Sequence, residues 1–193
     1  MDTATPEGRS AEEQRLFVAV PLPEEVLSTV RCAQEALPSV SGLRLLRTEQ
    51  LHVTLAFIGQ ANEGKARAAK EVIGGLSSNL GGEGVLGGFL FLPSVRRARV
   101  VALAIDDAGG DFAAVFERVM CGLEAAEVMK REKRPFRPHL TIARLRNPGL
   151  VEPKSECAEV AYRIGSVCLY RSELKPEGAQ YTVLCRKIMA ADG

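Results

Sequence analysis

The sequence predicts a mixed α and β fold with two similar lobes, because a strand–helix–strand pattern occurs twice along the chain. The chain has two histidines, and each begins the same motif of His, an aliphatic residue, Thr, an aliphatic residue and Ala: LHVTLAFIG at His52 and PHLTIAR at His139. The strands before them, VAVPL and VVALAI, and the later strands, GFLFLP and SVCLYRS, also correspond. A β–α–β unit occurring twice indicates two lobes related by an approximate twofold axis.

The elements of the first lobe follow from local patterns. Residues 15–22, RLFVAVPL, form a short apolar run with β-branched residues, which is typical of a buried strand. Pro23 is suited to the start of a helix, and apolar residues continue in a stripe to Leu37. Asn62 is a suitable N-cap for a second helix. The other expected elements are an edge strand, the first histidine strand and that second helix: residues 43–46, 51–59 and 62–76.

The second lobe follows a glycine-rich stretch, residues 81–88. This stretch lacks the G-K-[ST] ending of a phosphate-binding loop and opens no helix, so we expect a flexible connection. Residues 109–129 have the apolar stripe of an amphipathic helix. The expected strands of this part are residues 89–93, 99–105, 138–144, 165–171 and 181–188.

The length of 193 residues is enough for one domain with its own core. Residues 1–14 are polar, and we expect a disordered tail that precedes a single domain of residues 15–189. No apolar run is long enough for a membrane span, and no signal peptide precedes the fold.

Charge and cysteine content narrow the class of protein. The formal net charge of +1 gives no signature of a protein that wraps duplex nucleic acid, so any basic partner site must be local. The five cysteines are widely spaced and include no C-x-x-C pair. This pattern favours reduced thiols in a cytoplasmic protein and offers no zinc site.

The two histidine motifs are expected to place their polar side chains on one face of each strand. Side chains of a strand alternate with period two, so Thr54 lies on the face of His52 and Thr141 on the face of His139. The intervening Val53 and Leu140 are expected to face the core. We expect the two polar faces to meet across a cleft.

These residue types favour chemistry at phosphorus. A pair of imidazoles can hold one base and one acid near neutral pH, and threonine hydroxyls can donate hydrogen bonds to phosphate oxygens. Two His, two Thr and a nearby Arg suit in-line displacement without a metal. A hydrogen-bonded structural role for each histidine is the plain alternative. Zinc binding through both histidines is another, but no third ligand is evident.

The motifs HVTLAFIG and PHLTIARL resemble those of the two-histidine phosphoesterase superfamily, in its LigT-like branch. The start RLFVAVPLP, the segment RPFRPHLTIAR and the strand LYRSEL are similar to that branch's RNA 2′,3′-cyclic phosphodiesterases, so the resemblance covers nearly the whole chain after the tail. It implies a bilobal α+β fold with mainly antiparallel sheets around a central groove. The implied reaction is hydrolysis of a terminal 2′,3′-cyclic phosphate of RNA to a 2′-phosphate, without cofactor or metal. A weak reverse 2′-5′ RNA ligation is also associated with this family.

The resemblance implies roles for five residues. His52 and His139 are the catalytic pair, and Thr54 and Thr141 bind the phosphate. We assign His139 as the base on water and His52 as the acid on O3′, although the near symmetry leaves the reverse open. Arg144 matches an arginine expected to contact the phosphate, yet strict alternation puts it opposite His139, so the strand must end or twist there. The first motif has no equivalent arginine.

A basic segment, residues 130–137, precedes the second histidine strand. Arg134, Phe136 and Arg137 have the charge and the aromatic ring that bind single-stranded RNA, although such a run is equally typical of a solvated connection. Phe57 is expected by alternation to face the core.

Other functions stay open on the sequence alone. A module that binds a nucleotide or RNA end without catalysis would use the same groove, but it would not need an acid–base pair. An enzyme for another cyclic phosphate, such as ADP-ribose 1″,2″-cyclic phosphate, would share the motifs. The expected partners are single-stranded RNA ends or small cyclic nucleotides, with no membrane and no obligatory protein partner.

Overall fold

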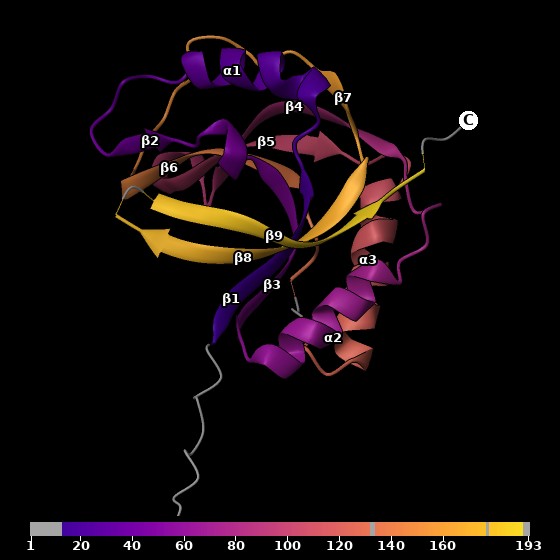
Figure 1. The fold of residues 1–193 in the computed structure, drawn as a ribbon. Helices are drawn as coiled ribbons and strands as arrows, with labels where there is room; N and C mark the ends of the chain where they lie inside the picture. The colour runs from indigo at the N-terminus through magenta and orange to yellow at the C-terminus, as the bar shows by residue number, and fades with distance from the viewer. Residues whose placement is uncertain (1–12, 132–133, 177, 191–193) are drawn as a thin grey trace, which may run out of the picture.

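The computed structural model describes residues 13–131, 134–176 and 178–190, and within them the chain forms an open sheet of nine strands with three α-helices (Figure 1). The strands are β1 (Gln14–Pro21), β2 (Leu43–Leu45), β3 (His52–Ala61), β4 (Glu83–Leu92), β5 (Ala98–Asp106), β6 (His139–Gly149), β7 (Val160–Arg163), β8 (Ser166–Lys175) and β9 (Gly178–Ile188). The α-helices and 3-10 turns are α1 (Leu27–Glu35), α2 (Glu63–Gly74), α3 (Asp111–Ala125), η1 (Glu24–Val26), η2 (Thr48–Gln50) and η3 (Val95–Arg97).

The sheet has the strand order β7-β4-β5-β6-β3-β1-β8-β9, and β2 pairs with β6. Each half repeats the other outward from the middle, since β6, β5 and β4 correspond to β3, β1 and β8. This arrangement confirms the predicted duplication and the antiparallel α+β class. The strands that flank each repeated helix, β1 with β3 and β5 with β6, pair antiparallel. The halves form one continuous sheet, joined where Val53 of β3 pairs with Leu140 of β6, so the polar faces lie side by side.

The helices cover the apolar face of the sheet. Figure 1 shows α1 apart from α2 and α3, which pack against each other. Val53 and Leu140 are fully buried, as predicted. Tyr162 on β7 is also fully buried, and its hydroxyl donates to the Pro21 carbonyl at 3.0 Å. That contact ties an end strand of one half to β1 of the other half.

The glycine-rich stretch is not a flexible connection: residues 83–88 form the first half of β4. A Cβ on Gly84 would lie 2.6 Å from Ile105 Cγ2, and a Cβ on Gly87 would lie 2.8 Å from Glu159 Cγ. Glycine therefore allows neighbouring segments to approach this strand closely. Without side chains at these positions the stretch showed no strand pattern, and the short strand β7 beside it was not predicted either.

Most other element positions were predicted within a few residues. The expected tail, residues 1–14, lies outside the described residues except for its last two, and Gln14 already belongs to β1. Asn62 caps α2 as predicted, because its side-chain oxygen accepts a hydrogen bond from the Lys65 N–H at 2.9 Å.

The Asn62 cap gives a direct test of this local prediction. Asn62→Ala should lower the free energy of unfolding by about 1 kcal/mol, because one N–H group at the start of α2 loses its partner. Asn62→Asp keeps an acceptor there and should retain the stability. Urea unfolding of the three proteins checks this; equal midpoints for Asn62→Ala and the parent would show that the cap contributes nothing.

Candidate active site

The two H-x-T motifs lie next to each other on one face of the sheet. In an antiparallel pair, the residue before a paired residue lies opposite the residue that follows its partner. The Val53–Leu140 pair therefore puts His52 level with Thr141 and brings Thr54 level with His139. Val53 and Leu140 point into the core, so all four polar side chains occupy the opposite face. Each of the four is partly exposed.

Both histidine strands carry a β-bulge directly after the threonine. The extra residue on β3, relative to β1, is Leu55. The extra residue on β6, relative to β5, is Ile142. A bulge interrupts the alternation of side chains. The residues five positions after each histidine, Phe57 and Arg144, therefore return to the histidine face.

Arg144 lies on the face of His139 although strict alternation placed it on the other. The bulge at Ile142 removes the conflict, so the strand need not end there. Arg144 is exposed, and its positive charge contributes to lowering the pKa of His52. Its guanidinium therefore lies within electrostatic reach of His52 on the other strand.

Phe57 does not face the core, and that prediction was wrong. Its side chain is 56% exposed, and its ring centroid lies 6.3 Å from that of Phe17, which also neighbours His52. The bulge at Leu55 moved it to the histidine face. Phe57 is thus the counterpart of Arg144 in the first half, where the sequence indicated no equivalent.

An aromatic cluster surrounds His52. Its ring centroid lies 4.8 Å from that of Phe17, 5.3 Å from that of Tyr181 and 6.2 Å from that of Tyr170. The phenol of Tyr170 is itself largely buried, and this burial is the main reason that its pKa lies above the ordinary range. The cluster excludes water from one side of the imidazole.

Burial lowers the pKa of His52 to about 4. A hydrogen bond with the Gln50 backbone acts in the opposite direction, while the charges of Arg144 and His139 lower the pKa further. At neutral pH the imidazole of the free protein is therefore uncharged.

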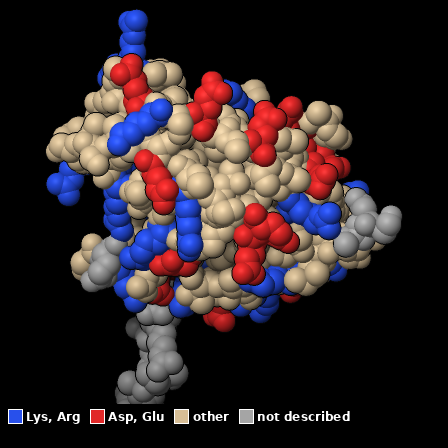
Figure 2. Space-filling view, turned by 90° about the horizontal axis from the view of Figure 1, so that it is seen from above, with Lys and Arg blue, Asp and Glu red and all other residues tan. Residues whose placement is uncertain are grey.

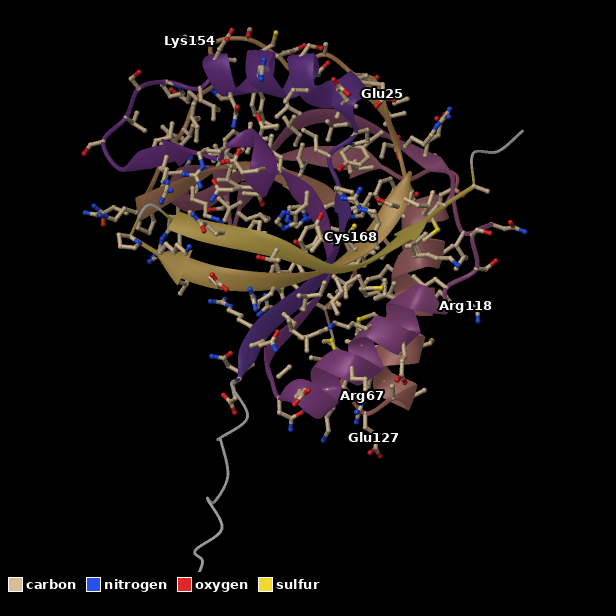
Figure 3. The ribbon with its side chains drawn as sticks, in the orientation of Figure 1. Glu25, Arg67, Arg118, Glu127, Lys154 and Cys168 are labelled. Atoms are coloured by element: carbon tan, nitrogen blue, oxygen red, sulfur yellow. The ribbon has the colours of Figure 1, made fainter. Side chains whose placement is uncertain are left out.

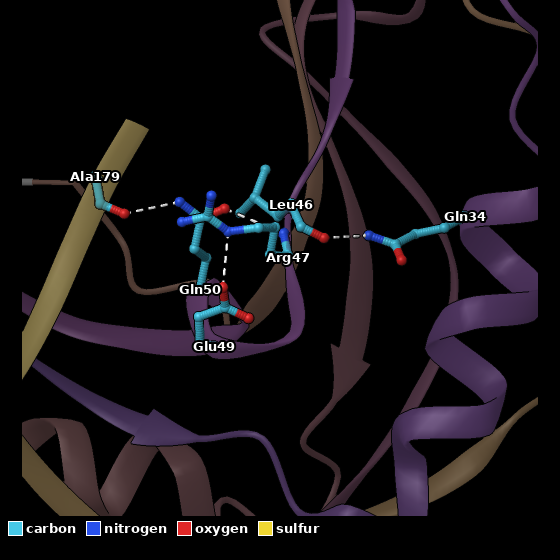
Figure 4. Close-up of polar contacts among 6 residues, drawn as sticks. All are labelled: Gln34, Leu46, Arg47, Glu49, Gln50 and Ala179. Carbon is cyan, nitrogen blue, oxygen red and sulfur yellow. Dashed lines mark hydrogen bonds and ion pairs between the residues drawn. The ribbon is translucent and has the colours of Figure 1, made fainter. Parts of the chain in front are cut away.

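The loop before β3 holds His52 through the backbone of Gln50, and Figure 4 shows how the Gln50 side chain is itself held. The Gln50 side chain is buried; it accepts a hydrogen bond from the Arg47 N–H at 3.0 Å and donates one to the Ala179 carbonyl at 2.9 Å. These bonds fix the residue whose backbone contacts the His52 ring, and they tie η2 to the start of β9.

His139 is oriented in the same manner as His52. Its Nδ1 lies 2.7 Å from the Arg137 carbonyl, and because a carbonyl only accepts, Nδ1 carries the hydrogen. In both motifs the ring is held by the backbone two residues upstream. Among the described residues, no other hydrogen bond engages this ring, so its Nε2 has no partner there.

The basic segment lies beside the histidine strand but is not a simple run of exposed groups. Arg134 and Arg137 are exposed, as a contact with RNA requires. Phe136 stacks on Phe116 with ring centroids 4.2 Å apart and planes 4° apart, so one face of its ring is already covered. Residues 132 and 133 lie outside the described residues.

The described residues include neither a metal-binding cluster nor a membrane-spanning helix. No three His, Cys, Asp or Glu side chains in this part of the chain gather where they could hold a metal ion. None of its helices is both long enough and apolar enough to cross a membrane.

Two H-x-T strands at the centre of a duplicated antiparallel sheet define a two-histidine phosphoesterase. The chain matches the model of the 2'-5' RNA ligase superfamily over residues 22–175 and belongs to that family. The RNA 2',3'-cyclic phosphodiesterase of Methanothermobacter thermautotrophicus is 31% identical over an alignment of 183 residues, and the alignment covers 87% of this chain and 95% of that protein.

Solved structures agree with this fold. The crystal structure of TT0787 from Thermus thermophilus has a TM-score of 0.71 and 29% identity, and the match covers 91% of this chain and 97% of that one. The apo structure of LigT from E. coli has a TM-score of 0.77 and 23% identity, covering 93% and 99%. These matches confirm the predicted LigT-like fold.

The low pKa of His52 predicts a loss of stability in acid. Unfolded histidine takes up a proton near pH 6.5, whereas folded His52 does so near pH 4. Between these values the unfolded state binds more protons, so the free energy of unfolding falls as the pH falls, by up to about 3 kcal/mol.

Urea unfolding between pH 7 and pH 4 measures this dependence. His52→Gln should remove most of the contribution, whereas the matched variant His139→Gln should keep most of it. If the free energy of unfolding of His52→Gln still fell steeply as the pH fell, the pH dependence would belong to other groups.

Proposed function

We propose that the protein hydrolyses the 2′,3′-cyclic phosphate at the end of an RNA and leaves a 2′-phosphate. The observation that carries the proposal is the Val53–Leu140 register, which gathers both H-x-T motifs on one face. Two imidazoles, two hydroxyls and a guanidinium around one place suit in-line displacement at phosphorus. The substrate is supported by a relative named RNA 2',3'-cyclic phosphodiesterase that is 31% identical over 87% of this chain.

The proposed reaction assigns one task to each residue. The Nε2 of His139 accepts a proton from water as the water oxygen bonds to phosphorus. The bond between phosphorus and O3′ breaks, and His52 gives its proton to O3′. Hydroxyls of Thr54 and Thr141 donate to the non-bridging oxygens, and Arg144 offsets their negative charge.

His52 needs a proton before it can act as the acid. Its pKa of about 4 leaves it neutral in the free protein at neutral pH. The negative charge of a bound cyclic phosphate favours the imidazolium and raises this pKa. In this proposal the substrate itself therefore completes the acid–base pair.

Phe57 supplies a surface for the terminal base. Its exposed ring stands on the histidine face beside Phe17. Bases of single-stranded RNA stack on aromatic side chains.

We also propose a cytoplasmic location. All five cysteines are free thiols, as expected in the reducing environment of the cytoplasm.

The reaction is tested with an RNA oligonucleotide that ends in a 2′,3′-cyclic phosphate, in the presence of EDTA. We expect turnover to a 2′-phosphate. His52→Ala and His139→Ala should each lower the rate by roughly 10²–10⁴-fold, the usual contribution of acid–base catalysis. Thr54→Ala and Thr141→Ala should lose less, because each removes one hydrogen bond to the phosphate.

Circular dichroism of each variant controls for loss of the fold. Wild-type turnover in either histidine variant would contradict the paired mechanism, and a 3′-phosphate product would contradict the choice of leaving oxygen. Activity that depends on added metal would contradict the metal-free reaction.

The roles of the two histidines are separated by a substrate with sulfur in place of O3′. A thiolate leaves without protonation, so this substrate should restore much of the activity of His52→Ala and little of that of His139→Ala. Rates of both variants on the oxygen and sulfur substrates check this. Rescue of His139→Ala alone would reverse the assignment.

A further inference from the structure

A cavity of about 830 Å³ adjoins His139, and the proposed reaction makes no use of it. Its lining includes Leu90 and Ala104 on one face of the sheet and Ile105 on the other face, at the end of β5. Ala104 pairs with His139, and Leu90 pairs with Ala102, which itself pairs with Thr141. Residues directly opposite in neighbouring strands share a face. The cavity therefore reaches the histidine face beside His139, and α3 bounds it on the other side.

The charges that line this cavity leave a local positive excess. Both of its acids are engaged: the Asp107 carboxylate accepts two N–H groups at the start of α3 at 2.9 and 2.8 Å, and Glu117 pairs with Arg131 at 2.6 Å. Within the described part of the chain, the guanidinium groups of Arg134 and Arg137 form no ion pair or hydrogen bond. The excess is local, because the net charge is +1 and both signs mix on the face in Figure 2.

Two aromatic rings belong to the apolar wall of the cavity. Phe116 of α3 and Phe136 stack on each other and both line the cavity. Its volume lies within the roughly 300–1,000 Å³ of small-molecule sites, which is room for a nucleotide. Aromatic rings combined with arginines are the means by which proteins hold single-stranded RNA.

We infer that this cavity holds the penultimate nucleotide of the RNA, which is the nucleotide on the 5′ side of the one that carries the cyclic phosphate. Arg134 and Arg137 bind its phosphate, and the Phe116–Phe136 wall packs against its base or ribose. The inference rests on the proposed function, and it adds that the preferred substrate is an oligonucleotide. A cyclic mononucleotide has nothing to place in the cavity, whereas all of the remaining RNA lies on the 5′ side of a terminal cyclic phosphate.

The test compares kcat/KM for a trinucleotide ending in a 2′,3′-cyclic phosphate with kcat/KM for 2′,3′-cyclic AMP. The parent protein should prefer the trinucleotide. The double variant Arg134→Gln/Arg137→Gln should lower this preference by about tenfold, the size expected for a lost charge-assisted hydrogen bond. The double variant should lose kcat/KM mainly for the trinucleotide and keep most of its kcat/KM for 2′,3′-cyclic AMP.

A matched control removes the same charge elsewhere. Arg67 of α2 and Arg118 of α3 are exposed on the two packed helices (Figure 3). Arg67→Gln/Arg118→Gln should keep the substrate preference of the parent. If both double variants lost the preference for the trinucleotide to a similar extent, net charge, and not the cavity, would attract the RNA.

Two further outcomes separate this inference from the proposed function. Hydrolysis of both substrates with a preference that Arg134→Gln/Arg137→Gln leaves unchanged would overturn the cavity while the function stands. Hydrolysis of neither would overturn the function. In that case, fluorescence anisotropy with a labelled trinucleotide tests whether the cavity binds RNA. Arg134→Gln/Arg137→Gln should weaken the binding about tenfold and make the Kd less dependent on salt. An unchanged Kd would overturn the inference about the cavity.

Discussion

The contact between β3 and β6 is the constraint on which the rest of the molecule depends. One register pair, Val53 with Leu140, joins the two halves of the sheet. Both side chains are fully buried on the apolar face. A slip of one residue would turn the imidazoles into that core and the apolar side chains into solvent. The burial of two ordinary aliphatic residues thereby fixes the position of four polar groups on the other face.

The bulges decide what stands beside those four groups. In each half an extra aliphatic residue follows the threonine, so Leu55 and Ala56 are both buried, as are Ile142 and Ala143. Two consecutive buried residues are the physical sign that alternation has been interrupted. The same local irregularity occurs twice, and it delivers an exposed ring in one half and a guanidinium in the other.

Much of this arrangement could be predicted from the sequence, because it is encoded in local patterns that repeat. The duplication, the H-x-T faces and the cap at Asn62 each need only a few neighbouring residues. The face of Phe57 could not be predicted by strict alternation, since a bulge depends on the partner strand. Comparing the two motifs position by position would have found it, because Phe57 and Arg144 follow their histidines at the same distance.

Contacts between distant segments were harder to predict. A side chain at Gly84 or Gly87 of β4 would clash with Ile105 or Glu159, and both of these residues lie far from the glycines in the sequence. The stacking of Phe136 on Phe116 likewise joins a loop to a helix, and a basic run in the sequence does not reveal which of its members are engaged.

The asymmetry between Phe57 and Arg144 gives direction to a repeated scaffold. Two imidazoles and two hydroxyls related by a twofold axis are unchanged by half a turn, so alone they would present the same groups to either ring oxygen of a cyclic phosphate. A phenyl ring on one side and a positive charge on the other remove that degeneracy. In the proposed reaction, the regiochemistry of ring opening then depends on groups outside the shared motif, namely Phe57 and the aromatic cluster at His52 on one side and Arg144 on the other, and the shared part of the repeat supplies reactivity without orientation.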